Sequence, residues 1–256
     1  MLLSPDGWIY FPKPKKQAPL RLFCFPGGGA SATMFFPWIE WLPDSIEVAA
    51  VQLPGRTPEL PEPTGTNLAL IVQEIADAIR QYQDRPFAFF GHSLGGVLAF
   101  EVARYLSLHF ALEPMHLFFA CCPPLHLPRT LLPLLNVPEQ ELLPLLLSTF
   151  ADSLPMLQRR SSQQHFLTLT HLDLIFWKDY HFTPGKAFTC PLTILSGAQD
   201  TLFHAELLSG WTVHTTGPCS FQTFPGNHCF FYSNPVPLLQ TLVQCMGQEI
   251  RQEVVS

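Results

Sequence analysis

Six short apolar runs recur along the chain, and amphipathic segments long enough to form helices separate several of them. The runs lie at 20–25, 46–52, 87–90, 115–121, 191–196 and 219–224. Their Phe, Val, Ile and Leu content is typical of strands buried on both faces. Amphipathic patterns favour helices at 67–82, 94–108 and 236–246. This alternation predicts an α/β fold with a mostly parallel central sheet and helices on both faces.

Residues 125–182 break the alternation because they contain no convincing strand. Leu-rich helical patterns occupy 131–135 and 141–150, and an aromatic one occupies 165–180. The segment is too long for a single crossover helix. We therefore expect one domain, residues 1–256, whose helical lid is inserted over the carboxyl edge of the sheet, where α/β proteins bind ligands. The alternative is a helical packing layer with no gating role.

Composition excludes several classes of protein. Only 13% of the residues are charged, about half the average share, which favours broad apolar surfaces. A net charge of −6 without a long basic run argues against nucleic acid. No apolar stretch is long enough to span a membrane, and the first ten residues do not resemble a signal peptide. Seven irregularly spaced Cys argue against a disulfide framework and for a reducing compartment, so we expect a cytoplasmic protein. We also expect it to be a monomer.

One hexapeptide carries the strongest chemical signal: Gly91-His92-Ser93-Leu94-Gly95-Gly96, between the run 87–90 and the helical pattern that follows. In that context G-x-S-x-G is typical of the nucleophile elbow of α/β-hydrolases. Gly91 and Gly95 permit a turn in which side chains would clash, and Ser93 stands at its tip beside the positive end of the helix dipole. We predict that Ser93 is a nucleophile. The alternative is a glycine-rich turn with an idle serine.

A serine nucleophile needs a base, and in this fold the chain order is serine, acid, histidine. His228 follows the last apolar run and is the predicted base, with His204 and His214 as alternatives. Asp200 follows the run 191–196 and is the predicted acid, although it would also suit the cap of a following helix. Three aspartates within the expected lid are poorer candidates: Asp152, Asp173 and Asp179.

An oxyanion hole requires two backbone N–H groups directed at the developing negative charge. Leu94, the residue after the predicted nucleophile, should supply one. The loop that follows the first run contains three successive glycines, which allow its backbone to approach a substrate closely. We predict Gly28 as the second donor and Gly27 as the next choice. A phosphate-binding loop is the rival interpretation, but the Walker pattern and its Lys are missing.

Several motifs together resemble the type II thioesterases of polyketide and nonribosomal peptide synthesis. They are FCFPGGGAS, VQLPGR, FGHSLGG, DYHFTPG, CPLTILSGAQD and FPGNHCFFY, spread over about residues 20–240. The resemblance implies an α/β-hydrolase fold with a mobile helical lid. It also implies hydrolysis, without metal or cofactor, of acyl or aminoacyl thioesters on the phosphopantetheine arm of carrier proteins. The alternatives are an esterase or lipase for small free oxygen esters and a non-catalytic module on the same scaffold.

Two positions depart from the pattern of this family. The family's oxyanion loop usually reads Pro-His-Ala-Gly-Gly, whereas this chain has Pro26-Gly27-Gly28-Gly29-Ala30. The family's Arg-Ala-Asp in the lid is replaced by His171-Leu172-Asp173, which bears on lid contacts and acyl preference. Four basic residues are a candidate patch for docking an acidic carrier protein: Lys13, Lys15, Lys16 and Arg129.

Overall fold

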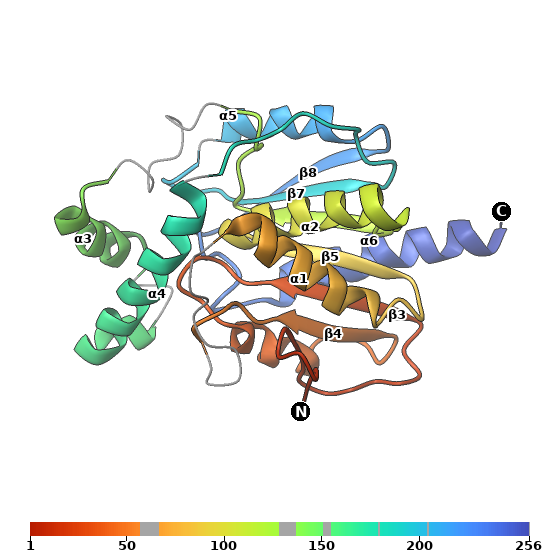
Figure 1. Cartoon of the computed structure of the whole chain (residues 1–256), viewed down its shortest axis with the longest axis horizontal. Helices are drawn as coiled ribbons and strands as arrows, with labels where there is room; N and C mark the ends of the chain where they lie inside the picture. The colour runs from red at the N-terminus through yellow and green to blue at the C-terminus, as the bar shows by residue number, and fades with distance from the viewer. Residues whose placement is uncertain (57–66, 128–136, 151–154, 179, 204, 256) are drawn as a thin grey trace.

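The computed structural model describes residues 1–56, 67–127, 137–150, 155–178, 180–203 and 205–255. Within them, one sheet of eight strands runs through the molecule in the order β1-β2-β4-β3-β5-β6-β7-β8 (Figure 1). The strands are β1 Leu2–Leu3, β2 Ile9–Phe11, β3 Leu20–Phe25, β4 Ile46–Val51, β5 Phe87–His92, β6 His116–Ala120, β7 Leu192–Gly197 and β8 Cys219–Phe224. Strands β3 to β8 pair in parallel.

The six expected strands are present, each within two residues of its expected bounds. Two further strands, β1 and β2, were not expected: they pair antiparallel with each other, and β2 pairs antiparallel with β4 at one edge. These strands are too short to show a period of two residues. Their pairing is long-range, as Ile9 is opposite Val51, so local pattern does not reveal it. The mostly parallel α/β sheet is confirmed.

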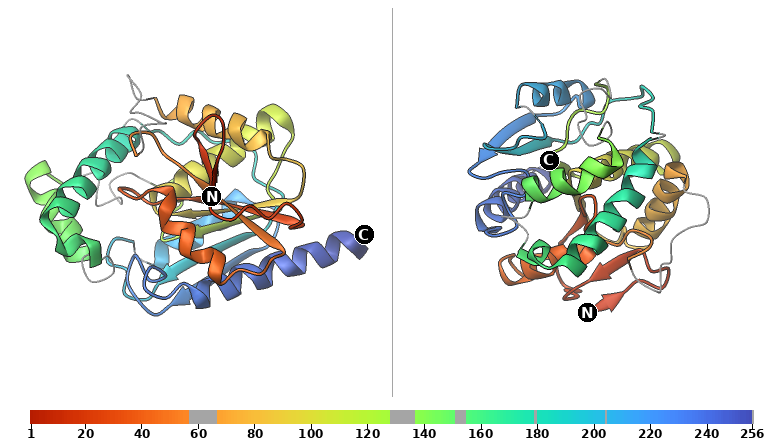
Figure 2. Two further views of the ribbon diagram at one scale, coloured as in Figure 1. Left: turned by 90° about the horizontal axis from the view of Figure 1, so that it is seen from below. Right: turned by 90° about the vertical axis from the view of Figure 1, so that its left-hand side faces the viewer.

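Helices cover both faces of the sheet (Figure 2, left). On one face lie α1 (Leu68–Arg80) and α2 (Leu94–Phe110), and on the other lie α6 (Val236–Val255) and the 3₁₀ helix η1 (Ala32–Glu40). The Asn67 side chain caps α1 by accepting a hydrogen bond from the Ala69 N–H at 2.9 Å. The doubly covered sheet follows from strands that are apolar on both sides.

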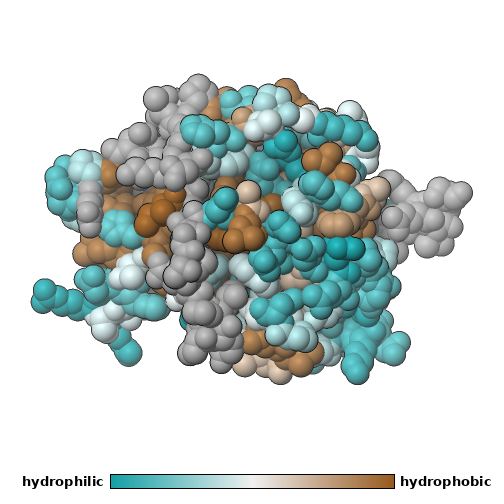
Figure 3. Space-filling view, in the orientation of Figure 1, coloured by the Kyte–Doolittle hydropathy of each residue, from teal (hydrophilic) through white to brown (hydrophobic). Residues whose placement is uncertain are grey.

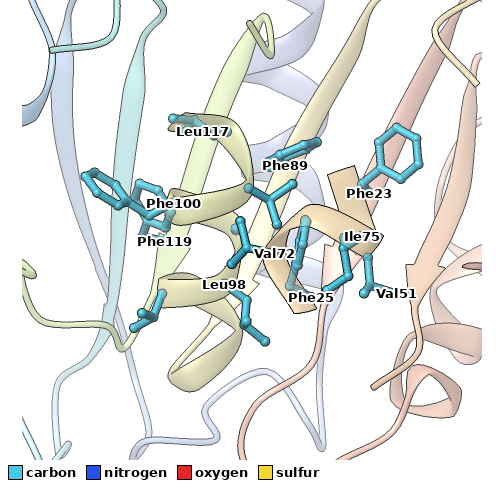
Figure 4. Close-up of a cluster of buried hydrophobic side chains, with 14 of the residues drawn as sticks. Phe23, Phe25, Val51, Val72, Ile75, Phe89, Leu98, Phe100, Leu117 and Phe119 are labelled. Atoms are coloured by element: carbon cyan, nitrogen blue, oxygen red, sulfur yellow. The ribbon is translucent and has the colours of Figure 1, made fainter. Parts of the chain in front are cut away.

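Two separate cores result from the alternation of side chains along each strand. Phe23 and Phe25 of β3 pack with α1 and α2 (Figure 4), whereas Leu22 and Cys24 pack with η1 and α6. On β5, Phe89 belongs to the first core and Phe90 to the second. Burying each such phenylalanine contributes about 1.5–3 kcal/mol. The sheet is thus held from both sides, which makes its carboxyl edge a rigid platform.

A helical insertion, residues 137–150 and 155–178, lies beyond the carboxyl ends of the strands, at the left of Figure 1. It contains α3 (Glu139–Phe150), η4 (Pro155–Gln158) and α4 (Arg160–Lys178), where helices were expected at 141–150 and 165–180. The helical pattern at 131–135 lies outside the described residues. Buried side chains join the insertion to the rest of the molecule: Leu142, Leu146, Phe150, Leu157, Phe166, Leu202 and Cys229.

Other elements join β7 to β8: α5 (Ala205–Leu208) and η5 (Ser209–His214), neither of which was expected. Cys24, Cys121 and Cys122 are buried and form no disulfide, as the sequence predicts. Among the helices of the described residues, none combines the length and the apolar character needed to cross a bilayer.

Candidate active site

Ser93 occupies the sharp turn between β5 and α2. Its backbone has φ 53° and ψ −119°, which is a strained conformation for a residue with a side chain. The turn closes so tightly that a Cβ on Gly91 would lie 2.5 Å from the Gly95 carbonyl oxygen. A Cβ on Gly95 would in turn meet the carbonyl oxygens of Phe25 and Pro26. Only glycine fits both positions, and this geometry presents Ser93 to the cavity described below.

Asp200 and His228 meet at the same carboxyl edge, just beyond β7 and β8. His228 Nδ1 and Asp200 Oδ2 are 2.9 Å apart, and both side chains are almost fully buried. The Leu202 N–H donates to the other Asp200 oxygen at 2.8 Å and fixes the carboxylate. Burial opposes ionisation of Asp200, but the hydrogen bond and the charge of His228 outweigh it, so the Asp200 pKa lies below its ordinary value.

The alternative bases are not in this arrangement. His214 lies on η5, where its Nε2 is 2.8 Å from His126 Nδ1 and its ring packs on Trp211. His204 lies outside the described residues. His228 Nε2 is buried and has no hydrogen-bond partner among the described residues, and no hydrogen bond joins it to Ser93. Hydrogen bonds of this kind often form only with substrate in place.

His92 holds the backbone of His228. Its Nε2 is 2.9 Å from the His228 carbonyl oxygen, and the two rings lie 5.0 Å apart. Burial and the neighbouring His228 lower the pKa of His92 to about 3, so its ring is neutral and Nε2–H is the donor. A Cβ on Gly27 would lie 2.6 Å from His92 Nδ1. Gly27 therefore makes room for this ring.

Cys121 adds a third group beside Asp200 and His228. It directly follows β6 and has φ 48°, and its Sγ, an Asp200 oxygen and a His228 nitrogen lie within 4.8 Å of one another. A Cys, Asp and His set is able to ligate Zn²⁺. Here the Asp200 carboxylate already binds His228, and burial raises the pKa of the Cys121 thiol well above its ordinary value. These contacts suit a hydrogen-bonded network better than a metal centre.

The two predicted oxyanion donors lie next to each other. A Cβ on Gly28 would contact the Leu94 side chain at 3.8 Å, so the Gly28 backbone lies beside the start of α2. The next amide along the loop is occupied, because the Gly29 N–H donates to Asp173 Oδ2 at 2.7 Å. Gly28 and Leu94 thus lie close together, and their amides stay the predicted oxyanion donors.

Neither the motif that contains Arg56 nor the lid stretch that contains Asp173 reveals that the two residues pair. The Asp173 carboxylate forms an ion pair with Arg56 at 2.5 Å. Both side chains are 1% exposed. Arg56 closes the VQLPGR motif, and that motif was the available signal. The pair links α4 to the loops that follow β3 and β4.

The candidate site opens onto a cavity of about 690 Å³. Ser93 and His228 line it together with Gly28 and Leu94, and apolar side chains of the helical insertion and η1 supply much of the remaining wall: Met34, Pro37, Trp38, Trp41, Leu146, Phe150, Phe166, Leu169, Leu174 and Trp177. Apolar residues also gather on the outer surface around the insertion, at the left of Figure 3. The cavity therefore suits a ligand with an apolar chain.

The expected docking patch does not surround this cavity. Lys15 Nζ contacts the Pro43 carbonyl oxygen and Asp44, just before β4 begins. The amino ends of the parallel strands lie there, whereas Ser93 is at a carboxyl end. Arg129 lies outside the described residues. Lys15 therefore lies near the amino ends of the strands, at the other end from Ser93, and the docking role of the patch stays a prediction.

Comparison with known proteins identifies the family. A model of the thioesterase domain matches residues 20–244. The chain belongs to the thioesterase domain family. The medium-chain S-acyl fatty acid synthase thioesterase of Rattus norvegicus is 32% identical over 224 residues, which cover 86% of this chain and 84% of that protein. The resemblance to thioesterases expected from the motifs is confirmed, and the protein is an enzyme that hydrolyses thioesters.

Two further comparisons concern one relative in sequence and one solved structure. Linear gramicidin dehydrogenase LgrE of Brevibacillus parabrevis is 31% identical over 240 residues, covering 93% of this chain and 91% of that protein. That protein is named a dehydrogenase, whereas the family model that matches this chain describes a thioesterase domain. The structure of BorB, a type II thioesterase from the borrelidin biosynthetic cluster, aligns with TM-score 0.80 and 25% identity, covering 93% of this chain and 96% of BorB.

Proposed function

We propose that this thioesterase releases acyl or aminoacyl groups from the phosphopantetheine arm of carrier proteins, as an editing enzyme of the type II class. Ser93 is the nucleophile, His228 the base, and Asp200 the acid that orients His228. The observation that carries the proposal is that His228, paired with the buried Asp200, lines the same apolar cavity as Ser93. The family match supports the thioester, and relatives such as BorB support the biosynthetic context.

The first step forms an acyl-enzyme. His228 Nε2 takes the proton of Ser93 Oγ while the oxygen attacks the thioester carbonyl carbon. The Gly28 and Leu94 N–H groups stabilise the oxyanion, and Asp200 stabilises the imidazolium through Nδ1. When the tetrahedral intermediate collapses, the C–S bond breaks and His228 returns the proton to the pantetheine sulfur. A thiol of pKa near 8.5 leaves more readily than an alcohol.

The second step releases the acid. Water donates a proton to His228 and attacks the ester carbonyl of the acyl-enzyme, and the same two amides stabilise the second oxyanion. Collapse breaks the bond between the acyl carbon and Ser93 Oγ, which recovers its proton from His228. The net reaction consumes one water and yields a carboxylic acid and a free thiol. The scheme requires no metal or organic cofactor.

We assign the role of a lid to the helical insertion within 125–182, in a single domain spanning 1–256. Its side chains Leu146, Phe150 and Phe166 supply cavity wall above the carboxyl edge of the sheet. An acyl chain bound there would bury apolar area on both sides, which favours apolar acyl groups.

Presenting the same acyl group in three ways tests the proposal. The acyl group is attached to a phosphopantetheinyl carrier protein, to free pantetheine, or to an alcohol as an oxygen ester, and kcat/KM is compared with Ser93→Ala as the blank. We expect the highest kcat/KM for the carrier-bound thioester and loss of all three activities in Ser93→Ala. Higher kcat/KM on the oxygen ester would favour an esterase, and full activity of Ser93→Ala would contradict the mechanism.

A further inference from the structure

We propose that Asp173 is a positioning residue for the reaction: from α4 it sets the orientation of the oxyanion loop, and Arg56 neutralises its charge beside the oxyanion. The oxyanion loop is here residues 27–30, between β3 and η1. The inference rests on the proposed role of Ser93, but not on the identity of the acyl group or carrier.

The first support is a buried network across three parts of the chain. The Asp173 carboxylate accepts a hydrogen bond from the Gly29 N–H at 2.7 Å and pairs with Arg56 Nη2 at 2.5 Å. Arg56 also donates through Nε to the Ala30 carbonyl oxygen at 3.3 Å and through Nη1 to the Pro54 carbonyl oxygen at 2.6 Å. The loop is therefore fixed on both sides of Gly29. Asp173 binds the Gly29 N–H, and Arg56 binds the carbonyl oxygen of the next residue, Ala30.

The second support is the contact between α4 and the loop. Gly29 has φ 74°, a conformation that favours glycine, and a Cβ there would collide with Thr170 Oγ1 and approach the Phe166 ring to 2.5 Å. Both residues belong to α4. The helix therefore rests directly on the oxyanion loop, at the one residue whose amide its carboxylate captures. A shift of α4 would move that amide.

The third support is the assignment of successive amides. Because Asp173 occupies the Gly29 N–H, this donor does not compete for the oxyanion, and the Gly28 N–H is left beside Leu94. Without this anchor the loop would rest on the hydrogen bond from the Ala30 N–H to the Gly27 carbonyl oxygen and on the Arg56 contact to Ala30, so the Gly28 amide would be held less firmly. Loss of one oxyanion donor lowers kcat by about 10²–10³. If the donor is present but loosely directed, kcat should fall by a smaller factor.

The charge of Arg56 is the fourth element. A Cβ on Gly28 would lie 3.9 Å from Asp173 Oδ2, so the carboxylate is close to the place where the oxyanion develops. Two like charges at such a distance repel strongly in a buried site. The Arg56 guanidinium cancels this repulsion. Burial raises the pKa of Asp173, so without Arg56 the repulsion acts only where the carboxyl stays ionised. At the alkaline end of the assay range, removing Arg56 alone should therefore impair the reaction more than removing the charges of both partners.

Three variants and one control test these roles: Asp173→Ala, which removes the acceptor of the Gly29 N–H, Arg56→Gln, the double variant, and Ile175→Ala, an exposed position on α4. Acetyl-pantetheine and p-nitrophenyl acetate are the substrates, because an acetyl group is too short to depend on the apolar wall. We expect kcat of Asp173→Ala to fall about tenfold or more with KM changed less than about threefold. At the alkaline end of the assay range, where Asp173 is ionised, Arg56→Gln should fall further, and the double variant should return to the level of Asp173→Ala. Ile175→Ala should match the wild type.

A purely structural link predicts another pattern. If Asp173 only fastened the insertion, its variant would raise KM for a decanoyl thioester and lower the unfolding temperature, while kcat on acetyl substrates stayed within about threefold of wild type. That result would overturn the proposal, as would a double variant slower than Arg56→Gln. Thermal unfolding of each variant shows whether the protein is folded at the temperature at which kcat is measured. If the wild type cleaved only the p-nitrophenyl ester, the proposed thioester function would fail while this comparison remained valid.

Discussion

Replacing Asp200 with Asn would keep the size of the side chain and remove the charge that faces His228. The structure determines how the new amide would turn. The Leu202 N–H donates to Asp200 Oδ1 at 2.8 Å, so the Asn oxygen would remain at that position. The NH₂ group would then occupy the position of Oδ2, which is 2.9 Å from His228 Nδ1. An NH₂ donor there requires Nδ1 to be the acceptor.

This orientation would force His228 into the wrong tautomer. With Nδ1 accepting, the ring proton lies on Nε2, and the base cannot remove a proton from Ser93. The same change in a trypsin-like triad lowers kcat by about 10⁴. His228 and Asp200 are almost fully buried, so solvent would not replace the lost charge. At about 1.36 kcal/mol for each factor of ten, we expect a barrier about 5 kcal/mol higher.

The assay is single-turnover acylation of the enzyme by an acyl-pantetheine thioester, measured as the rate at which the free thiol appears. Asp200→Asn should acylate about 10³–10⁴ times more slowly than wild type. Asp77→Asn is a matched control, because Asp77 is on α1 and its partner is the half-exposed Arg80. A decrease of less than about tenfold in Asp200→Asn, with Asp77→Asn unchanged, would refute the assignment of the acid.

Three further predictions concern the scaffold. Gly29→Ala places a methyl group against Thr170 and Phe166, so both kcat/KM and the unfolding temperature should fall; unchanged kcat/KM would contradict the close contact with α4. Phe89→Ala should lower the free energy of unfolding by about 3–5 kcal/mol in urea titrations, and a loss below about 1 kcal/mol would mean that the core had repacked. Burial lowers the pKa of His116 to about 4, so only the unfolded state gains its proton as pH falls from about 6.5 to about 4, and stability is lost over that range. His116→Asn should flatten this loss in thermal unfolding relative to His109→Asn, an exposed control, and equal slopes would count against it.

Local pattern was sufficient for the central sheet and for its nucleophile turn. The run 87–90 followed by G-x-S-x-G dictates a strand, a tight turn and a helix, because each feature depends on neighbouring residues. Asp200 and His228 were placed together by a topological rule: the carboxyl ends of parallel strands share one edge of the sheet. That rule brings the residues near each other, but it says nothing of a 2.9 Å hydrogen bond.

Other features carry no local signal. The short strands β1 and β2 exist because β4 offers an open edge to Ile9 and Tyr10. The 3₁₀ helix η1 and the segment from α5 to η5 lack the length and periodicity that distinguish a helix in sequence. Each forms because neighbouring elements bury its side chains, as the burial of Trp38 and Trp211 shows.

The sequence by itself determined the six parallel strands of the sheet, the serine at the tip of its central turn, and the order of acid and base along the chain. Those are consequences of periodicity and of backbone sterics within a few residues. Only the tertiary structure decided that Asp173, 117 residues after Arg56, would pair with it and capture the Gly29 amide. A contact of that kind has no period or motif of its own, because it arises from the packing of α4 on the oxyanion loop.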